Sequence, residues 1–214
     1  MWRPHSPKRS DGSFLTGGII IKKIIFVIGK TASGKDTVAR ILQYKHDIPA
    51  VVSYTTRPMR ASEKDGREHF FVSKDRMEEI CSNEHVLAYT RFPNTGYEYC
   101  ATTESLKGDV NVYIIDPPGV EWFKSQNTLG GLDVEFKSIY VDLPEGQIRK
   151  RALSRGDGEE AVEARLTSER EIFDAFYEDN QYDYCISNTG TKEELEAKTD
   201  AIYHMIMRDF GENR

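Results

Sequence analysis

The stretch that most restricts how this chain can fold is GKTASGKDT at residues 29–37. Gly29, Gly34 and Lys35 have the spacing G-x-x-x-x-G-K of a phosphate-binding loop, whose backbone N–H groups bind phosphate oxygens. The run before it, IIIKKIIFVIG, is typical of a buried strand, and DTVARILQYKH after it carries apolar residues at helical spacing. A strand, a glycine loop and a helix in that order are the setting that this loop requires. We therefore interpret the stretch as a phosphate site.

Further apolar runs predict more strands of the same sheet. They are VNVYIIDPPG (110–119), FKSIYVDLP (136–144) and QYDYCISN (181–188). Helical segments lie between and after them, and the last, KEELEAKTDAIYHMIMRDF, carries Leu195, Ile202 and Ile206 on one face. Strands that alternate with helices predict an α/β fold with a parallel sheet.

Two regions break this alternation. One is rich in short strand-like pieces (HFFVS, VLAYTRF and YEYCATT), and the other carries basic residues around a Gly-Asp-Gly break. We interpret them as an inserted β-rich binding lobe (residues 53–105) and a helical lid (145–170). The remainder, residues 19–52, 106–144 and 171–214, would form the α/β core. Residues 1–18 are expected to be a disordered extension or a cloning tag.

Composition excludes several classes of function. The chain has 214 residues and a net charge of −6, which argues against broad binding of nucleic acid or membranes. No run approaches the roughly 18 apolar residues of a membrane span. Cys81, Cys100 and Cys185 lie far apart in the sequence without a C-x-x-C pair, which favours free thiols in a reducing compartment. We expect a cytoplasmic protein that is a monomer or a homodimer.

The residue after the loop lysine is Asp36, where a phosphate loop usually carries the Ser or Thr that binds Mg²⁺. Asp36 can bind Mg²⁺ directly or through water, or it can only cap the helix, and Thr37 could supply the hydroxyl instead. Asp116, at the end of a strand, is either a second carboxylate for Mg²⁺ or a cap before Pro117-Pro118. These alternatives stay open. We expect ATP to lie on Gly29, Lys30, Thr31, Ala32, Ser33, Gly34, Lys35, Asp36 and Thr37.

Arginines elsewhere suit a reaction between two anions. Arg57 and Arg60 flank a stiff Pro58, and two guanidinium groups held in this way can bind one phosphate. Arg151 and Arg155 are four residues apart, hence on one helical face that could close over a triphosphate. For each arginine the alternative is an ordinary surface charge.

Together these motifs resemble the guanylate kinase family. The resemblance rests on the loop, on S-x-T-T-R-x-x-R-x-x-E-x-x-G from Ser53, on the region of Tyr99, on Asp116-Pro117-Pro118-Gly119, on RALSRG with Arg165, and on YDYCISN. It implies a three-layer α/β/α core of the P-loop NTPase type, with an inserted lobe that binds the monophosphate acceptor and a helical lid. It also implies a kinase that uses ATP and Mg²⁺, with GMP as the leading acceptor.

The resemblance also implies roles for the matched residues. Lys35 and the loop would hold ATP, with Asn188 near its adenine. Ser53 lies where the family touches the base, and Glu63 would order the arginines. The residues implied for acceptor binding are Ser53, Arg57, Arg60, Glu63, His69, Tyr99 and Asp116. The arginines implied to stabilise the transferring phosphoryl group are Arg151, Arg155 and Arg165, which with Lys35 form the expected catalytic set.

The chain departs from the family on the side that reads the base. The guanine-reading glutamate falls on Ala88, or on Leu87 with a shift of one residue, and the neighbouring serine falls on Ala101. A phosphate-binding tyrosine falls on His69. Losing the carboxylate should cost roughly 1.5–3 kcal/mol of guanine binding, unless Glu98 or Glu104 replaces it.

A related group of kinases acts on ribose 1,5-bisphosphate and shares three features with this chain. These are G-K-D in the loop, a histidine at the position of His69, and the absence of the glutamate that reads the base. Three functions therefore stay open. They are a GMP kinase, a kinase of another phosphate ester or nucleotide, and a non-catalytic binding module of the same fold.

Overall fold

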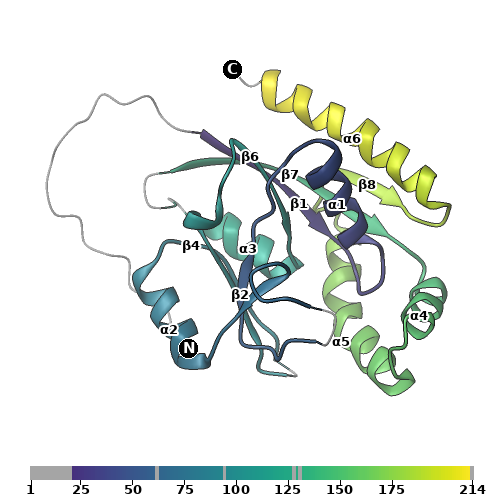
Figure 1. Cartoon of the computed structure of the whole chain (residues 1–214). Coiled ribbons are helices and arrows are strands. Elements are labelled where there is room, and N and C mark those ends of the chain that lie inside the picture. Colours follow the sequence, from purple (N-terminus) through teal and green to yellow (C-terminus); the bar gives the residue numbers. More distant parts are fainter. Residues whose placement is uncertain (1–20, 61–62, 94, 127–128, 130–131, 213–214) are drawn as a thin grey trace, which may run out of the picture.

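The computed structural model describes residues 21–60, 63–93, 95–126, 129 and 132–212, so the predicted extension 1–18 lies outside the described residues. Four parallel strands form one sheet (Figure 1), in the order β6 (Val110–Ile114), β1 (Ile21–Ile28), β7 (Asp133–Asp142) and β8 (Tyr184–Ser187). Three of these strands fall within the predicted apolar runs, and β7 overlaps its run 136–144 but begins three residues earlier. The predicted parallel sheet is confirmed.

Helices cover both faces of this sheet. Ile24, Phe26 and Ile28 of β1 pack on the face of α3 (Pro117–Ser125) and α5 (Glu159–Glu178), and Ile25 and Val27 pack on the face of α1 (Lys35–Lys45) and α6 (Lys192–Glu212). All five side chains are fully buried. A strand covered on both faces has no polar side, which explains why the sequence here is an unbroken apolar run. The three-layer α/β/α architecture is confirmed (Figure 1).

A second, mixed sheet lies in the region predicted to be inserted. Its order is β3 (His69–Phe71), β2 (Ser53–Thr55), β5 (Glu98–Thr102) and β4 (Val86–Arg91), with β2 and β3 parallel and the other pairs antiparallel. Helix α2 (Lys74–Asn83) covers one face, and a short 3₁₀ turn (Thr103–Ser105) follows β5. Cys81 of α2 and Cys100 of β5 meet there with their sulfur atoms 3.7 Å apart, although they are distant in sequence.

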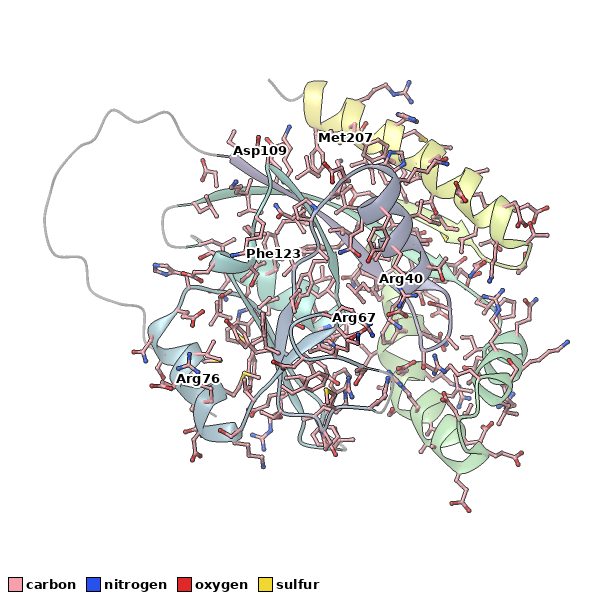
Figure 2. All side chains as sticks on the ribbon, in the orientation of Figure 1. Arg40, Arg67, Arg76, Asp109, Phe123 and Met207 are labelled. Atoms are coloured by element: carbon pink, nitrogen blue, oxygen red, sulfur yellow. The ribbon has the colours of Figure 1, made fainter. Side chains whose placement is uncertain are left out.

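The space between the two sheets is filled by aromatic side chains. Phe123 of α3 points into this interior (Figure 2), and its ring lies 5.1 Å from that of Phe26 and 5.2 Å from that of Phe136. On the other side of α3, the ring of Trp122 lies 5.5 Å from that of Tyr89 on β4, so α3 joins the second sheet to the parallel sheet. Within the described residues, no helix is long and apolar enough to cross a membrane.

The carboxyl ends of the parallel strands bring the predicted site together. The phosphate loop follows β1, Asp116 follows β6, and Asn188 follows β8. Ligands of open α/β sheets bind at this edge. Helix α4 (Glu145–Ser154) follows β7 at the same edge and packs on α5 through a small apolar cluster, which includes Ile148 and Leu166. Helix α5 continues beyond residue 170, where we placed the end of the lid, to Glu178.

Candidate active site

The phosphate loop is held from behind by Asn188. Gly34, at the start of α1, has φ 103°, and a Cβ atom there would lie 2.2 Å from the Asn188 side-chain nitrogen. That nitrogen donates a 2.7 Å hydrogen bond to the Ser33 carbonyl, and Asn188 is almost fully buried. The first amides of α1 have no partner within the helix and form an anion-binding terminus. The side chain of Asn188 therefore fixes the loop, and its expected place near adenine stays a prediction.

Lys35 lies at the centre of the loop. Its ammonium group donates to the Lys30 carbonyl at 3.4 Å. Burial lowers the pKa of Lys35, the charge of Asp36 opposes this, and Arg165 adds to the lowering. The loop thus holds a half-buried positive charge, as expected for a group that binds phosphate.

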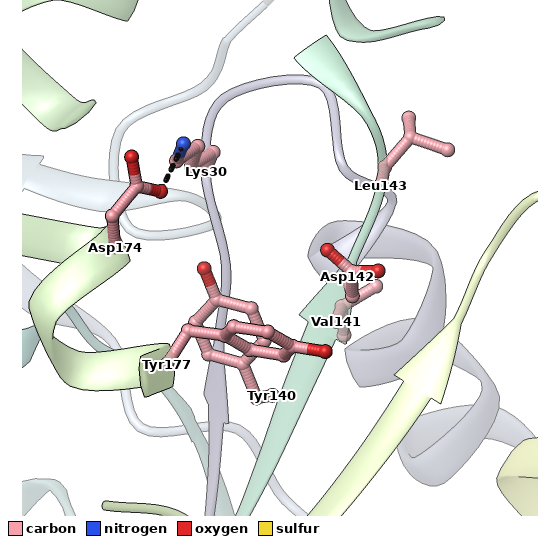
Figure 3. Close-up of a pocket in the computed structure, with 7 residues that line it drawn as sticks. All are labelled: Lys30, Tyr140, Val141, Asp142, Leu143, Asp174 and Tyr177. Atoms are coloured by element: carbon pink, nitrogen blue, oxygen red, sulfur yellow. Dashed lines mark ion pairs between the residues drawn. The ribbon is translucent and has the colours of Figure 1, made fainter. Parts of the chain in front are cut away.

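Lys30 points away from the loop interior. Figure 3 shows its ammonium beside Asp174, at 2.6 Å, and Glu145 lies 3.4 Å away on the other side. The small cavity there, about 40 Å³, is lined by Lys30, Tyr140, Val141, Asp142, Leu143, Asp174 and Tyr177. Arg170 binds Glu145 with two hydrogen bonds, and these mainly lower the pKa of Glu145 to about 2. The Lys30 side chain is therefore taken up by these two carboxylates, and the expected contact of Lys30 with ATP stays a prediction.

Glu169 is a residue of the site that sequence reasoning missed. Its carboxylate accepts hydrogen bonds from the Thr31 amide at 2.7 Å and from Arg165 Nε at 3.1 Å. The four-residue spacing predicts the contact with Arg165 on a helix. Nothing in the sequence predicts the contact with Thr31, which lies 138 positions away.

On the acceptor side, Arg57 is clamped by Glu63 and Tyr99. Its two Nη atoms donate to the Glu63 carboxylate at 3.0 and 2.8 Å, and its Nε donates to the Tyr99 hydroxyl at 3.1 Å. Glu63 also accepts from the Arg60 amide at 2.8 Å. Burial works against ionisation of Glu63, yet the hydrogen bonds from Arg57 and Arg60 lower its pKa. The structure thus brings together four of the predicted acceptor residues.

His69 and Ser53 form a second pair on this sheet. The His69 Nδ1 lies 2.9 Å from the Ser53 Oγ, and the His69 ring packs 5.5 Å from that of Tyr99. Burial, with a further contribution from the charge of Arg57, lowers the pKa of His69 to about 4, so the imidazole is neutral at pH 7.

The same face of the sheet carries Ala88 and Ala101, which are directly opposite each other and almost fully buried. Ala101 is two residues from Tyr99 on β5, and residues two apart share a face. Glu98, the neighbour of Tyr99, lies on the other face, where its carboxylate accepts a 2.6 Å hydrogen bond from Tyr89. Glu98 therefore does not replace the missing carboxylate on this face.

A cleft of about 570 Å³ lies where the phosphate loop, the connection between β2 and β3, and helices α4 and α5 meet. The charged and polar residues that line it are Thr31, Arg60, Glu63, Arg155, Asp157 and Arg165. Burial lowers the pKa of Arg60, and the charges of Arg165 and Arg57 lower it further, because several cations share this space. The positive charges of these arginines attract anions to the cleft.

The two lid arginines expected to act together occupy different places. Arg155 follows the end of α4, lines the cleft and forms an ion pair with Asp157. Arg151 donates instead to the Asn188 carbonyl at 2.8 Å. Arg155 therefore faces the cleft, whereas Arg151 supports the strand end behind the loop.

The predicted Mg²⁺ ligands also separate. Asp36 and Thr37 are exposed in the first turn of α1, whereas Asp116 caps α3. The Asp116 Oδ1 accepts from the Gly119 amide at 2.8 Å and from Thr90 at 2.7 Å, and burial raises the pKa of this carboxyl. Capping is thus the role that the structure shows for Asp116, and its metal role stays a prediction. The described residues include no group of three or more acidic, histidine or cysteine side chains that could hold a metal by themselves.

The chain belongs to the guanylate kinase family, because the family model described as "Guanylate kinase" matches residues 21–205. One similar protein is the guanylate kinase of Anaplasma phagocytophilum, which is 27% identical in sequence over 86% of this chain and 85% of that protein. Another is the guanylate kinase of Streptococcus thermophilus, which is 29% identical over 89% of this chain and 92% of that protein. The crystal structure of the Anaplasma phagocytophilum guanylate kinase superposes with a TM-score of 0.62 at 22% identity, covering 89% of this chain and 87% of that one. The family consists typically of phosphotransferases.

Proposed function

We propose that this protein transfers the γ-phosphoryl group of ATP to the phosphate of a nucleoside monophosphate, with GMP as the leading acceptor and GDP and ADP as products. The observation that carries this proposal is the cleft in which the donor and acceptor residues face each other. One wall includes Thr31 of the phosphate loop, and another holds Arg60 beside the Arg57–Glu63 clamp. Phosphoryl transfer needs mainly positioning and charge stabilisation, which this arrangement provides.

The residues near the loop fit Mg²⁺ as a partner of ATP rather than as a resident ion. Asp36 offers an exposed carboxylate and Thr37 an exposed hydroxyl beside the loop, and Mg²⁺ prefers such oxygen ligands together with water and phosphate oxygens. When bound, Mg²⁺ neutralises charge on the phosphates of ATP. Lys35 and the first amides of α1 would bind the same phosphates, and Arg155 and Arg165 would stabilise the group in transit.

A second candidate is a kinase of the same fold that acts on another phosphate ester, such as ribose 1,5-bisphosphate, or on a different nucleotide. The specific observation in its favour is the acceptor face beyond Arg57. That face offers the Ser53–His69 pair and two buried alanines, Ala88 and Ala101, where a carboxylate would be needed to accept both guanine donors. A non-catalytic binding module is disfavoured, because the chain keeps Lys35 and the arginines of the cleft.

An assay of ADP release tests the proposal and separates the candidates. The protein is incubated with ATP, Mg²⁺ and, in turn, GMP, dGMP, AMP, UMP, CMP or ribose 1,5-bisphosphate. Preference for GMP supports the first candidate, and preference for ribose 1,5-bisphosphate or another nucleotide supports the second. ADP release that no acceptor stimulates would contradict both.

A further inference from the structure

Glu169 joins the phosphate loop to an arginine of the cleft. We propose that it is a positioning residue for phosphoryl transfer, which holds the Arg165 guanidinium at a fixed place relative to the loop. This inference rests on the proposed function. It adds a role for a residue whose contact with the loop is not visible in the sequence.

The geometry of the carboxylate carries the inference. Glu169 lies on α5 and is almost fully buried, with one oxygen bound to the Thr31 amide at 2.7 Å and the other to Arg165 Nε at 3.1 Å. Both bonds are made to strong donors, and the one to Arg165 is charge-assisted. A single side chain thereby sets the distance between a loop residue and a guanidinium.

The bond to Nε leaves the rest of Arg165 available. A guanidinium has five N–H groups, and only the Nε–H is used by Glu169, so the two Nη groups can bind other anions. Within the described part of the chain, this is the one hydrogen bond that the guanidinium makes. Arg165 lines the cleft together with Arg60 and Arg155, and its side chain is 40% exposed there. Without Glu169, the long arginine side chain would sample several rotamers.

The carboxylate also acts on the charge of the cleft. Arg165 and Arg155 lower the pKa of the half-buried Lys35, whereas the negative charge of Glu169 raises it. In the absence of substrate, the cations of the cleft repel one another, and Glu169 offsets part of this repulsion from behind the loop. Glu169 also binds the Thr31 amide, so this loop donor is not available to a phosphate of ATP.

A purely structural role would predict a different behaviour from a positioning role. If Glu169 only stabilises the fold, its substitution lowers the melting temperature and leaves the turnover of the folded protein unchanged. If it positions Arg165, its substitution lowers kcat, and this effect requires Arg165 to be present. A double-mutant cycle distinguishes the two, because it isolates the coupling between the residues.

The experiment compares Glu169→Gln, Arg165→Ala and the double variant with the wild-type protein, using ATP and the best acceptor of the panel above. Gln keeps a carbonyl oxygen for the Thr31 amide and removes the charge that binds Arg165. Glu171→Gln is the matched control, because Glu171 is exposed on the same helix. We expect Glu169→Gln to lower kcat about 10-fold with little change in the KM for ATP, as for one lost charge-assisted hydrogen bond. In the Arg165→Ala background, the same substitution should change kcat less than about 2-fold.

Two results would overturn the inference: an unchanged kcat in a folded Glu169→Gln variant, or a full 10-fold loss in the Arg165→Ala background. If Glu169→Gln does not fold, Arg165→Lys breaks the same bond from the other side and should lower kcat about 10-fold with an unchanged melting temperature; an unchanged kcat there overturns it equally. An active wild-type protein with unaffected variants refutes only the role of Glu169. A wild-type protein without acceptor-dependent ADP release refutes the proposed function as well.

Discussion

The phosphate loop and the acceptor lobe are stabilised in opposite ways. The loop is one continuous segment, but its supports come from far along the chain: Asn188 binds the Ser33 carbonyl, and Glu169 binds the Thr31 amide. In the lobe, the Arg57 guanidinium and the Glu63 carboxylate that holds it are six residues apart. The loop is therefore specified by a local motif and fixed by the whole domain, whereas the clamp on Arg57 is largely local.

The charges of the two regions differ as well. Among the residues that the structure describes, no carboxylate is bound to Lys35, the cation of the loop. In the lobe, Glu63 pairs with Arg57, and His69 is held neutral. A donor with several negative charges needs a strongly positive site, whereas a smaller acceptor can be selected by hydrogen bonds. This difference suggests that the lobe, rather than the loop, decides which molecule is phosphorylated.

The largest expected effect belongs to the loop. Lys35→Ala should lower kcat by about 100- to 1,000-fold or more, since it removes the half-buried cation that we propose binds the transferring phosphates. The fold should persist, because burial already disfavours this charge. Turnover and a circular dichroism melt measure the two effects. Arg40→Ala, on the exposed side of the same helix, is the control and should retain full activity. Acceptor-dependent ADP release by Lys35→Ala at the wild-type rate would refute the role of Lys35 in the transfer.

A smaller and more selective effect is expected in the lobe. Arg57→Ala should weaken acceptor binding roughly 10- to 100-fold and ATP binding much less, because it removes a guanidinium held by Glu63 and Tyr99 on the acceptor side. Titration calorimetry with each ligand measures this. Arg76→Ala, on the solvent side of α2 (Figure 2), serves as the control for a lost lobe charge. Equal losses for ATP and acceptor would erase the distinction between the two regions.

The neutral state of His69 predicts a dependence of stability on pH. In the folded protein burial holds its pKa at about 4, below the ordinary 6.5, so between these values the unfolded chain binds a proton that the folded protein does not. Stability is therefore full above pH 6.5 and falls as the pH is lowered towards 4. His69→Gln can still form a hydrogen bond to Ser53. Between neutral pH and pH 4, its free energy of unfolding should fall by about 2 kcal/mol less than that of the wild-type protein.

Urea unfolding of wild type and His69→Gln at neutral pH and at pH 4 measures the difference. His85→Gln is the control, since His85 is exposed in the same lobe. Identical pH dependence of wild type and His69→Gln would show that the imidazole is not held neutral.

Sequence reasoning predicted the fold and the approximate position of the site, because both depend on local patterns. The β-branched run of β1 followed directly by the glycines of the loop is typical of a buried strand that leads into a phosphate loop, and few other structures explain this order. The contacts of Lys30 and Glu169 could not be predicted in the same way. They depend on where α5 passes the loop, and tertiary packing sets this position.

The lobe shows the same limit. The motif predicts that Glu63 orders Arg57, and the two residues are indeed paired. The contact of Tyr99 with Arg57 and that of His69 with Ser53 arise from strand pairing, whose register no short motif contains. Two cysteines that are 19 residues apart in sequence also meet across α2 and β5.

The smallest expected effect concerns backbone strain, which again separates the two regions. Ala32 in the loop has φ 52°, whereas the positive φ angles described in the lobe belong to the glycines Gly66 and Gly96. Left-handed backbone costs a residue with a side chain about 1–2 kcal/mol, and glycine loses about 0.5–1 kcal/mol through its greater freedom in the unfolded chain. Ala32→Gly should therefore raise the free energy of unfolding by about 0.5 kcal/mol, measured by urea unfolding.

Asp47→Gly is the control for this substitution, because Asp47 has φ 55° in the connection after α1, outside the loop. If the strain at Ala32 holds the loop in the shape that binds phosphates, Ala32→Gly should also raise the KM for ATP slightly, while Asp47→Gly should not. A less stable Ala32→Gly variant would mean that the alanine side chain contributes packing, through its contact with the α4–α5 cluster, that outweighs the strain.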